Sequence, residues 1–204
     1  PYLTRKQVEA FGIFFFDGSL VIPTRDETGE LWGFQRILES GEKLFTKGQR
    51  VSGCFHKIPG TSGRILICEG YATGASLHMA TGAEVYCAFH AGNLAAVAKL
   101  VRKANPDSAI TIAGDDDQWT ADNPGRKKAD EAAQAALGSA SFPVFSSLDD
   151  KPTDFNDLHC REGRATLATQ IDAVSGLEKT FVPLGFDEQT CFVYSYDWRS
   201  IVKF

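Results

Sequence analysis

Hydrophobic residues near the start of the chain occur in short runs that are separated by turn sequences. Between Phe14 and Phe45 these runs alternate with turns such as Asp17-Gly18 and Ser40-Gly41. Closely spaced runs of this kind predict antiparallel hairpins. We expect strands at residues 14–16, 19–23, 31–38 and 43–45, preceded by a short helix over residues 4–10 that Gly12 ends.

From residue 64 onward, short apolar runs alternate with segments that have helical spacing. The runs predict strands at residues 64–68, 84–89, 109–113 and 142–145. The segments between and after them predict helices at residues 72–80, 94–101, 125–137 and 164–174. Strands separated by helices of about ten residues form a parallel sheet, so the predicted fold class is α/β.

These patterns divide the chain into three regions. We expect residues 1–60 to form a small, mainly β, basic subdomain with an antiparallel sheet. Residues 61–175 form the α/β core, and Thr61-Ser62-Gly63 is a flexible junction before it. Residues 176–204, with apparent β structure at 181–187 and 191–196, are a β-rich extension or the start of a following domain.

Composition narrows the class of protein. With 204 residues and 43% hydrophobic residues, the chain can bury a substantial core. No run is long and apolar enough to span a membrane and no signal-peptide pattern is present, so we expect a cytoplasmic protein without a membrane partner. The chain begins at Pro1 rather than Met, which suggests a piece of something larger.

The cysteines argue against a zinc site in this chain. There are five, scattered and odd in number, and none forms a C-x-x-C pair. Structural zinc sites need closely spaced pairs of such ligands. We therefore expect no zinc here.

The distribution of charge is more informative than its sum. The net charge of −5 argues against a uniformly basic nucleic-acid binder. Between residues 43 and 64, however, there are five basic residues and no acid, whereas acids concentrate at 115–117 and 149–157. Positive surface beside an acidic site suits an enzyme that handles polynucleotides. The alternative is a solvated basic loop.

Acidic residues follow two of the predicted core strands. Glu69 follows one, and Asp115-Asp116-Asp117 follow another. The carboxyl ends of such strands face the ligand crevice of open α/β sheets. Asp115 and Asp117 can aim at one ion while Asp116 points elsewhere, because side chains alternate along a strand. Clustered carboxylates favour Mg²⁺ or Mn²⁺. The alternatives are an exposed acidic turn and, for Glu69, an acid near a helix N-terminus.

Three motifs give the chain a family resemblance. Ile67-Cys68-Glu69-Gly70, Asp115-x-Asp117 and Asp154-Phe155-Asn156-Asp157, in that order, resemble the Toprim domain of primases, topoisomerases and some nucleases. The strings at 68–77 and 88–94 look most like Toprim primases of plasmids and phages, which are often joined to a helicase. The resemblance covers roughly residues 60 to 160.

The resemblance implies a Toprim-like parallel sheet flanked by helices and the activity of a DNA primase. Such an enzyme makes short RNA primers on single-stranded DNA from nucleoside triphosphates, by nucleotidyl transfer with two Mg²⁺ or Mn²⁺ ions. A helicase in the same or another chain is an implied partner. By position, the implied catalytic residues are Glu69, Asp115 and Asp117, with Asp154 as a further metal ligand.

The same resemblance implies contacts between the N-terminal subdomain and nucleotide or template. The candidates are Arg36, Lys47 and Arg50, which belong to the β region or to the basic loop after it. For Arg36 the alternative is an outward-facing strand residue without such a role.

Two other functions compete with the primase. One is a Toprim-type metal-dependent nuclease, and the other is a non-catalytic single-stranded DNA-binding module of a replication assembly. The basic β region before Glu69 favours the primase over the nuclease, because the nucleases are not usually preceded by it. The presence of all four acids argues against a module without chemistry.

Overall fold

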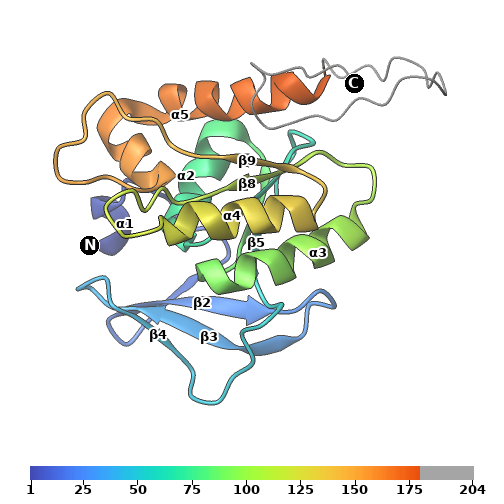
Figure 1. The fold of residues 1–204 in the computed structure, drawn as a ribbon. Coiled ribbons are helices and arrows are strands. Elements are labelled where there is room, and N and C mark those ends of the chain that lie inside the picture. Colours follow the sequence, from blue (N-terminus) through green and yellow to red (C-terminus); the bar gives the residue numbers. More distant parts are fainter. Residues whose placement is uncertain (180–204) are drawn as a thin grey trace, which may run out of the picture.

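The computed structural model describes residues 1–179, with side chains to residue 174, and consists of two sheets with helices around one of them (Figure 1). The β structure expected at 181–187 and 191–196 lies outside this range. Within residues 1–179, no helix combines the length and the apolar character that crossing a membrane requires.

The N-terminal sheet confirms the predicted meander. Its strands are β1 (Phe14–Phe16), β2 (Ser19–Arg25), β3 (Leu31–Ile37) and β4 (Lys43–Phe45). They pair antiparallel in the order β1-β2-β3-β4, so β1 and β4 are the edges. Leu20, Ile22 and Ile37 point from one face of this sheet into the main hydrophobic core. The small sheet is therefore packed firmly onto the rest of the chain.

The helix expected over residues 4–10 is wrong in extent, because α1 covers only Tyr2–Arg5. Gln7 has a φ of 53°, a left-handed conformation that ends the helix. The carbonyl of Lys6 is then free of the helix, and it accepts a hydrogen bond of 2.8 Å from Asn156 Nδ2. Burial of Tyr2 and Val8 holds the segment against the core.

The second sheet is the α/β core. It contains β5 (His56–Ile58), β6 (Ile65–Cys68), β7 (Glu84–Cys87), β8 (Ile110–Ala113) and β9 (Ser139–Ser141), in the order β5-β7-β6-β8-β9. The strands β6 to β9 pair in parallel, whereas β5 joins antiparallel to β7. All residues of β6 and β8 are buried, as expected for parallel strands covered on both faces.

The strand predicted at residues 142–145 is also wrong, because β9 covers 139–141 instead. Its small residues pair with residues 111–113 of β8. Pro143 lacks the N–H that a ladder position requires, and Val144 N donates instead to the side chain of Gln170. The hydrophobic Phe142 packs against the core cluster beneath α3 and α4 rather than extending the sheet.

Helices cover both faces of the core sheet (Figure 1). The helices α2 (Tyr71–Thr81) and α5 (Phe155–Lys179) pack together on one face, and α3 (Leu94–Ala104) and α4 (Pro124–Ala135) on the other. A short 3-10 turn, Ala91–Asn93, precedes α3. The last predicted helix begins earlier than residue 164, because α5 starts at Phe155 and is kinked at Gly163, where φ is 85°.

The close approach of α2 to the sheet gives a test of the packing. A Cβ added at Gly74 would overlap Cys87 Sγ and crowd Cys68 Sγ and Val85. Although Ala favours a helix over Gly, we expect Gly74→Ala to lower the free energy of unfolding by about 1–3 kcal/mol through overpacking.

Chemical denaturation of the single and double variants measures this effect. Cys87→Ala should recover part of the loss when it is combined with Gly74→Ala, because it removes the atom that the new methyl group meets. Strict additivity of the two substitutions would contradict the packing described for α2.

Candidate active site

A pocket of about 400 Å³ opens at the carboxyl ends of β6 and β8. Glu69, directly after β6, and Asp115, shortly after β8, line it together with Asp154, which lies just before α5. The structure therefore brings together three of the four predicted acids, from segments that lie far apart in the sequence. Arg5, Lys6 and Lys43 line the same pocket.

Burial and nearby carboxylates raise the pKa of the carboxyl groups in the pocket. Burial and the charge of Asp117 raise the pKa of Glu69 to about 7. Burial, and then the charges of Glu69 and Asp154, raise the pKa of Asp115 well above its usual range, whereas Lys43 acts in the opposite direction. Burial and the charge of Asp157 raise the pKa of Asp154. A shared cation would relieve this repulsion.

One carboxylate oxygen in the pocket is suited to binding such a cation. Asp115 Oδ1 is buried and has no hydrogen-bond partner. A buried polar atom without a partner is costly, unless it binds something the protein itself does not supply. Within residues 1–179, however, no three Asp, Glu, His or Cys side chains lie close enough together to form a ready-made metal site. The metal site stays a prediction.

The aspartates after β8 point in different directions. Asp116 accepts hydrogen bonds from Asn123 Nδ2 at 2.5 Å and from Arg126 at 3.1 Å, so it turns away from the pocket, as side-chain alternation suggests. Asp117 does not line the pocket, and its Oδ2 accepts a hydrogen bond of 2.9 Å from Gly125 N in the first turn of α4. Its charge nevertheless acts on Glu69.

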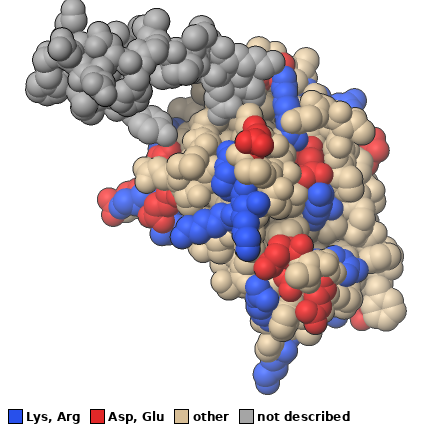
Figure 2. All heavy atoms as spheres, turned by 90° about the vertical axis from the view of Figure 1, so that its right-hand side faces the viewer, with Lys and Arg blue, Asp and Glu red and all other residues tan. Residues whose placement is uncertain are grey.

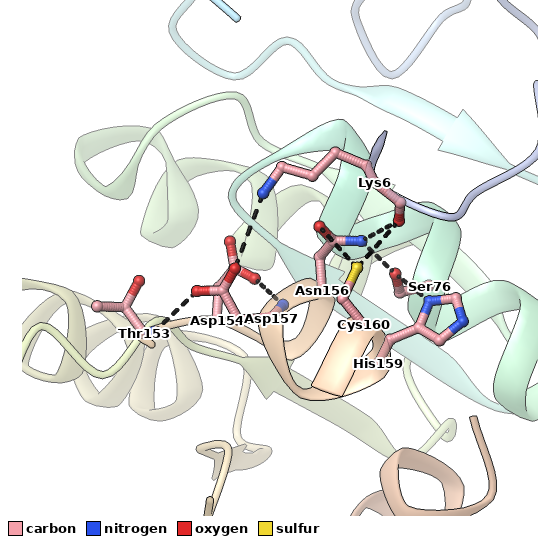
Figure 3. A network of polar contacts seen from close by, with 8 residues as sticks. All are labelled: Lys6, Ser76, Thr153, Asp154, Asn156, Asp157, His159 and Cys160. Atoms are coloured by element: carbon pink, nitrogen blue, oxygen red, sulfur yellow. Dashed lines mark hydrogen bonds and ion pairs between the residues drawn. The ribbon is translucent and has the colours of Figure 1, made fainter. Parts of the chain in front are cut away.

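Asp154 is held at the start of α5 by reciprocal capping. Its Oδ1 accepts from Asp157 N at 2.8 Å, and Asp157 Oδ2 accepts from Thr153 N at 3.0 Å (Figure 3). These bonds resemble a capping box and fix the direction of the third acidic motif. Lys6 Nζ lies 3.8 Å from Asp157 Oδ1, which brings a positive charge to the same place.

A buried polar network fastens the N-terminal segment to this motif (Figure 3). Asn156 Nδ2 donates both to the Lys6 carbonyl at 2.8 Å and to Ser76 Oγ at 2.9 Å. Ser76 Oγ in turn lies 3.0 Å from His159 Nδ1. Burial lowers the pKa of His159, which favours its neutral form. Asn156 and His159 therefore have structural positions that secure Lys6 beside the pocket.

The predicted basic residues lie outside the pocket. Arg36 donates to Ser19 Oγ at 2.9 Å and lies 3.4 Å from Asp17 Oδ2. Arg50 lies 3.7 Å from Asp26 Oδ2 and stacks over the Trp32 ring at 5.0 Å.

Lys47 is exposed in the loop after β4 and does not line the pocket either. Other members of the basic run, Lys57 and Arg64, form ion pairs with Glu84 and Asp172. Figure 2 shows basic and acidic side chains interspersed on one face, rather than a uniformly positive surface.

Lys43 is the functional candidate that sequence reasoning missed. It pairs in register with Ile37, which pairs with Leu20, and both hydrophobic residues are buried in the core. Residues in such a row share one face of the sheet, so the inward direction of Lys43 follows from its register. Hydrophobic alternation across the hairpins was the signal that could have identified it.

The end of β7 joins the small sheet to the pocket. Phe89 has a φ of 73°, which is rare for a bulky residue, and its N donates to the Glu69 carbonyl at 2.7 Å. Its ring meets Phe45 of β4 edge to face, with centroids 5.7 Å apart. Such backbone strain is typical of functional sites. Here it places Phe89 in the pocket wall next to Glu69.

These features are those of a Toprim domain. A family model described as "Toprim domain" matches residues 64–165, and the chain belongs to this family. Among curated proteins, a DNA primase TraC from Escherichia coli is 40% identical over 158 residues, which cover 72% of this chain and 11% of that protein. Another TraC from the same species is 42% identical, with 15% of its length covered. The chain thus spans only a small part of these relatives.

Solved structures share the fold at low sequence identity. The DnaG catalytic core has a TM-score of 0.59 and 15% identity, with 84% of this chain and 71% of that chain covered. The primase fragment of the bacteriophage T7 primase-helicase protein has a TM-score of 0.54 and 17% identity, with 78% and 66% covered. These matches confirm the predicted fold class.

The raised pKa of Glu69 predicts how stability changes with pH. A carboxyl whose pKa is about 7 when folded, against an ordinary 4.5, makes the fold less stable as pH rises through this interval. We expect Glu69→Gln to be more stable than the parent at pH 8, on the order of 2 kcal/mol without added metal, and nearly equal at pH 5.

Urea denaturation in a chelator at both pH values measures this difference. The comparison must be between variants, because burial lowers the pKa of His56 and His159, which favours the fold at higher pH. A stability difference that does not grow between pH 5 and pH 8 would contradict the repulsion described for the pocket.

Proposed function

We propose that the chain is the catalytic core of a DNA primase, which synthesises short RNA primers on a single-stranded DNA template. The observation that carries this proposal is the partnerless, buried oxygen of Asp115 in a pocket that Glu69, whose pKa is about 7, and Lys43 also line. The identity to proteins named DNA primase supports it. The reaction needs a template and nucleoside triphosphates, so we propose a cytoplasmic location.

The reaction joins two nucleotides. The 3′-hydroxyl oxygen of the primer bonds to the α-phosphorus of a nucleoside triphosphate, and the bond between that phosphorus and the bridging oxygen breaks. Pyrophosphate leaves with the electron pair, and the hydroxyl proton passes to a base. Bound Mg²⁺ or Mn²⁺, most simply two ions, would acidify the hydroxyl and offset the phosphate charge. Glu69, Asp115 and Asp154 would hold them, with Asp117 contributing its charge.

Other roles in the reaction, such as binding the triphosphate, fall to further side chains of the pocket. The pKa of about 7 belongs to Glu69 in the metal-free pocket, and an ion bound there would lower this pKa and favour the carboxylate that holds the ion. Lys43, Lys6 and Arg5 line the pocket together with the acids and would bind the triphosphate, so that its α-phosphorus lies among the acids. The Asn156 network keeps Lys6 in this position.

Arg36, Lys47 and Arg50 are proposed to contact template outside the pocket. Both side chains of the pair between Arg36 and Asp17 are exposed, and such pairs contribute little to stability, whereas Asp26, the partner of Arg50, is buried. A template phosphate can therefore compete with Asp17 for Arg36, and the partly exposed guanidinium of Arg50 can bind a phosphate while it stays paired with Asp26. A helicase is a further proposed partner, since the T7 structure comes from a primase-helicase protein.

Product analysis distinguishes this function from its competitors. With single-stranded DNA, labelled ribonucleotides and Mg²⁺ or Mn²⁺, we expect new oligonucleotides from the parent protein and at least a hundredfold loss in Asp115→Asn, as for other removed electrostatic stabilisers. Asp130→Asn, an exposed acid on α4, is the matched control and should retain activity. Shortened DNA would indicate a nuclease instead, and retarded DNA without product would indicate a binding module.

A pair of lysines tests how the triphosphate binds. Lys43 and Lys47 are both exposed basic residues in and after β4, but only Lys43 lines the pocket. We expect Lys43→Met to raise the KM for nucleotide roughly tenfold, because it removes one charge-assisted phosphate contact. Lys47→Met should leave this KM within about twofold. Equal effects on the KM for nucleotide would contradict the assignment of Lys43.

A further inference from the structure

The strand β9 forms an open edge of the core sheet. In the described part of the chain it pairs only with β8, at one end of the strand order. Gly114 N donates to the Ser141 carbonyl at 2.9 Å, so Ser139 and Ser141 turn their backbone groups toward β8. Because this direction alternates along a strand, Ala140 and Phe142 turn theirs to the open edge. Among residues 1–179, these outward groups have no hydrogen-bond partner.

A side-chain amide already occupies the next position along this edge. Val144 N donates to Gln170 Oε1 at 2.9 Å, and Gln170 Nε2 donates to the Val144 carbonyl at 2.8 Å. A carboxamide has the same hydrogen-bonding groups as a peptide bond, so Gln170 takes the place of one peptide unit of a neighbouring strand. Beyond it, Ser146 N donates to Glu162 Oε1 at 2.8 Å. The edge therefore binds a peptide-like group within this structure.

The sequence of this edge lacks the usual protection against a further strand. Edge strands in monomeric proteins commonly carry charged residues that prevent pairing with other chains. Residues 139–148 contain no charged residue. Pro143 offers no such protection either, because the N–H that it lacks would have faced β8. The outward donors at positions 142 and 144 are thus intact.

A groove of about 610 Å³ lies along the same edge, where β9 runs beneath α5 (Figure 1). Phe142 and Val144 line it from the edge and Ala173 from α5, and most of its lining is apolar. The charged side chains among the described lining residues are Asp116 and Arg126, which pair with each other at 3.1 Å. The groove therefore suits uncharged, apolar side chains. It shares no lining residue with the acidic pocket.

We propose that the open edge of β9 binds an extended, uncharged segment of a partner protein as an additional strand. The backbone of this segment bonds to Ala140 and Phe142 and displaces Gln170 from Val144, while its alternate apolar side chains enter the groove. A second copy of this chain fits less well, because its β9 is flanked by its own α5, whose Gln170 reaches over the edge. The inference does not rest on the proposed function.

Selection from a phage-displayed library of random dodecapeptides tests the proposal, with the full chain immobilised and Ala173→Glu used for counter-selection. Ala173 is exposed on α5, so a glutamate there places a charge in the groove and leaves the core intact. We expect peptides with uncharged, apolar residues at alternate positions. A library that yields no peptide bound by the parent and rejected by Ala173→Glu would overturn the proposal.

Fluorescence anisotropy of a labelled selected peptide measures the affinity. We expect Ala173→Glu to bind it roughly tenfold more weakly or worse, because the bound peptide would bury the new charge. The matched control is Ala165→Glu, which is exposed on the same helix but does not line the groove. It should bind the peptide within about twofold of the parent. Equal weakening by both substitutions would contradict the assignment of the groove.

Removal of the side-chain amide has the opposite expected effect. We expect Gln170→Ala to bind the peptide about threefold more tightly, because the N–H and carbonyl of Val144 are then free for the added strand. A purely structural role of Gln170 would leave the affinity unchanged or lower it. Either of these results would overturn the proposal.

N-methylation of the peptide tests whether its backbone pairs with β9. Methyl groups on alternate residues in one phase remove the donors that face the edge and should weaken binding roughly tenfold, whereas the other phase should have little effect. Equal affinity of the two methylated peptides would indicate an apolar contact without strand addition and would overturn the proposal. So would self-association, measured by light scattering, that Ala173→Glu abolishes. Circular dichroism checks that each variant folds.

Discussion

The burial of several carboxyl groups close together is the constraint to which the rest of this structure responds. Glu69, Asp115 and Asp154 come from separate segments and share one pocket, where burial first and nearby carboxylates second raise the pKa of each. Left alone, such a cluster destabilises the fold. In a chain of the Toprim family, a cation and a polyphosphate bound in the pocket would offset this loss of stability. The cluster then lowers the stability of the unliganded protein and favours binding of the cation and the polyphosphate.

The N-terminal region supplies the opposite charge. Lys43 reaches the pocket from the inner face of the small sheet, and Lys6 is secured by the hydrogen bond from Asn156 to its carbonyl. The edge-to-face contact of Phe45 with Phe89 fixes β4 against the strained end of β7. Since one face of the small sheet shares the main core, the acidic and basic residues of the pocket belong to one packed body.

Local pattern predicted the elements well and their long-range partners poorly. Alternation and turn residues located β1 to β4, and the apolar runs located β6 and β8 with their acids. The short β5 was missed because its pairing with β7 is set by residues far along the chain, and β9 was displaced because pairing with β8 outweighed hydrophobicity.

In the candidate site, too, some residues could be placed from the sequence and others could not. Acids that directly follow strands or precede a helix could be placed from the sequence, because element ends fix their location. The direction of a basic side chain could not be predicted from the sequence, because it depends on strand register and on nearby ion pairs. Arg36 and Arg50 thus lie away from the pocket, whereas Lys43 lies in it. The chemical roles of all these residues stay predictions.

Titration of the metal-free protein with Mn²⁺, followed by the electron paramagnetic resonance signal of the free ion, tests the central claim most directly. The account predicts that the parent protein removes Mn²⁺ from solution and that Asp115→Asn and Asp154→Asn each do so much more weakly, while Asp130→Asn behaves like the parent. Equal Mn²⁺ uptake by all four proteins would show that the acidic pocket does not hold the ion.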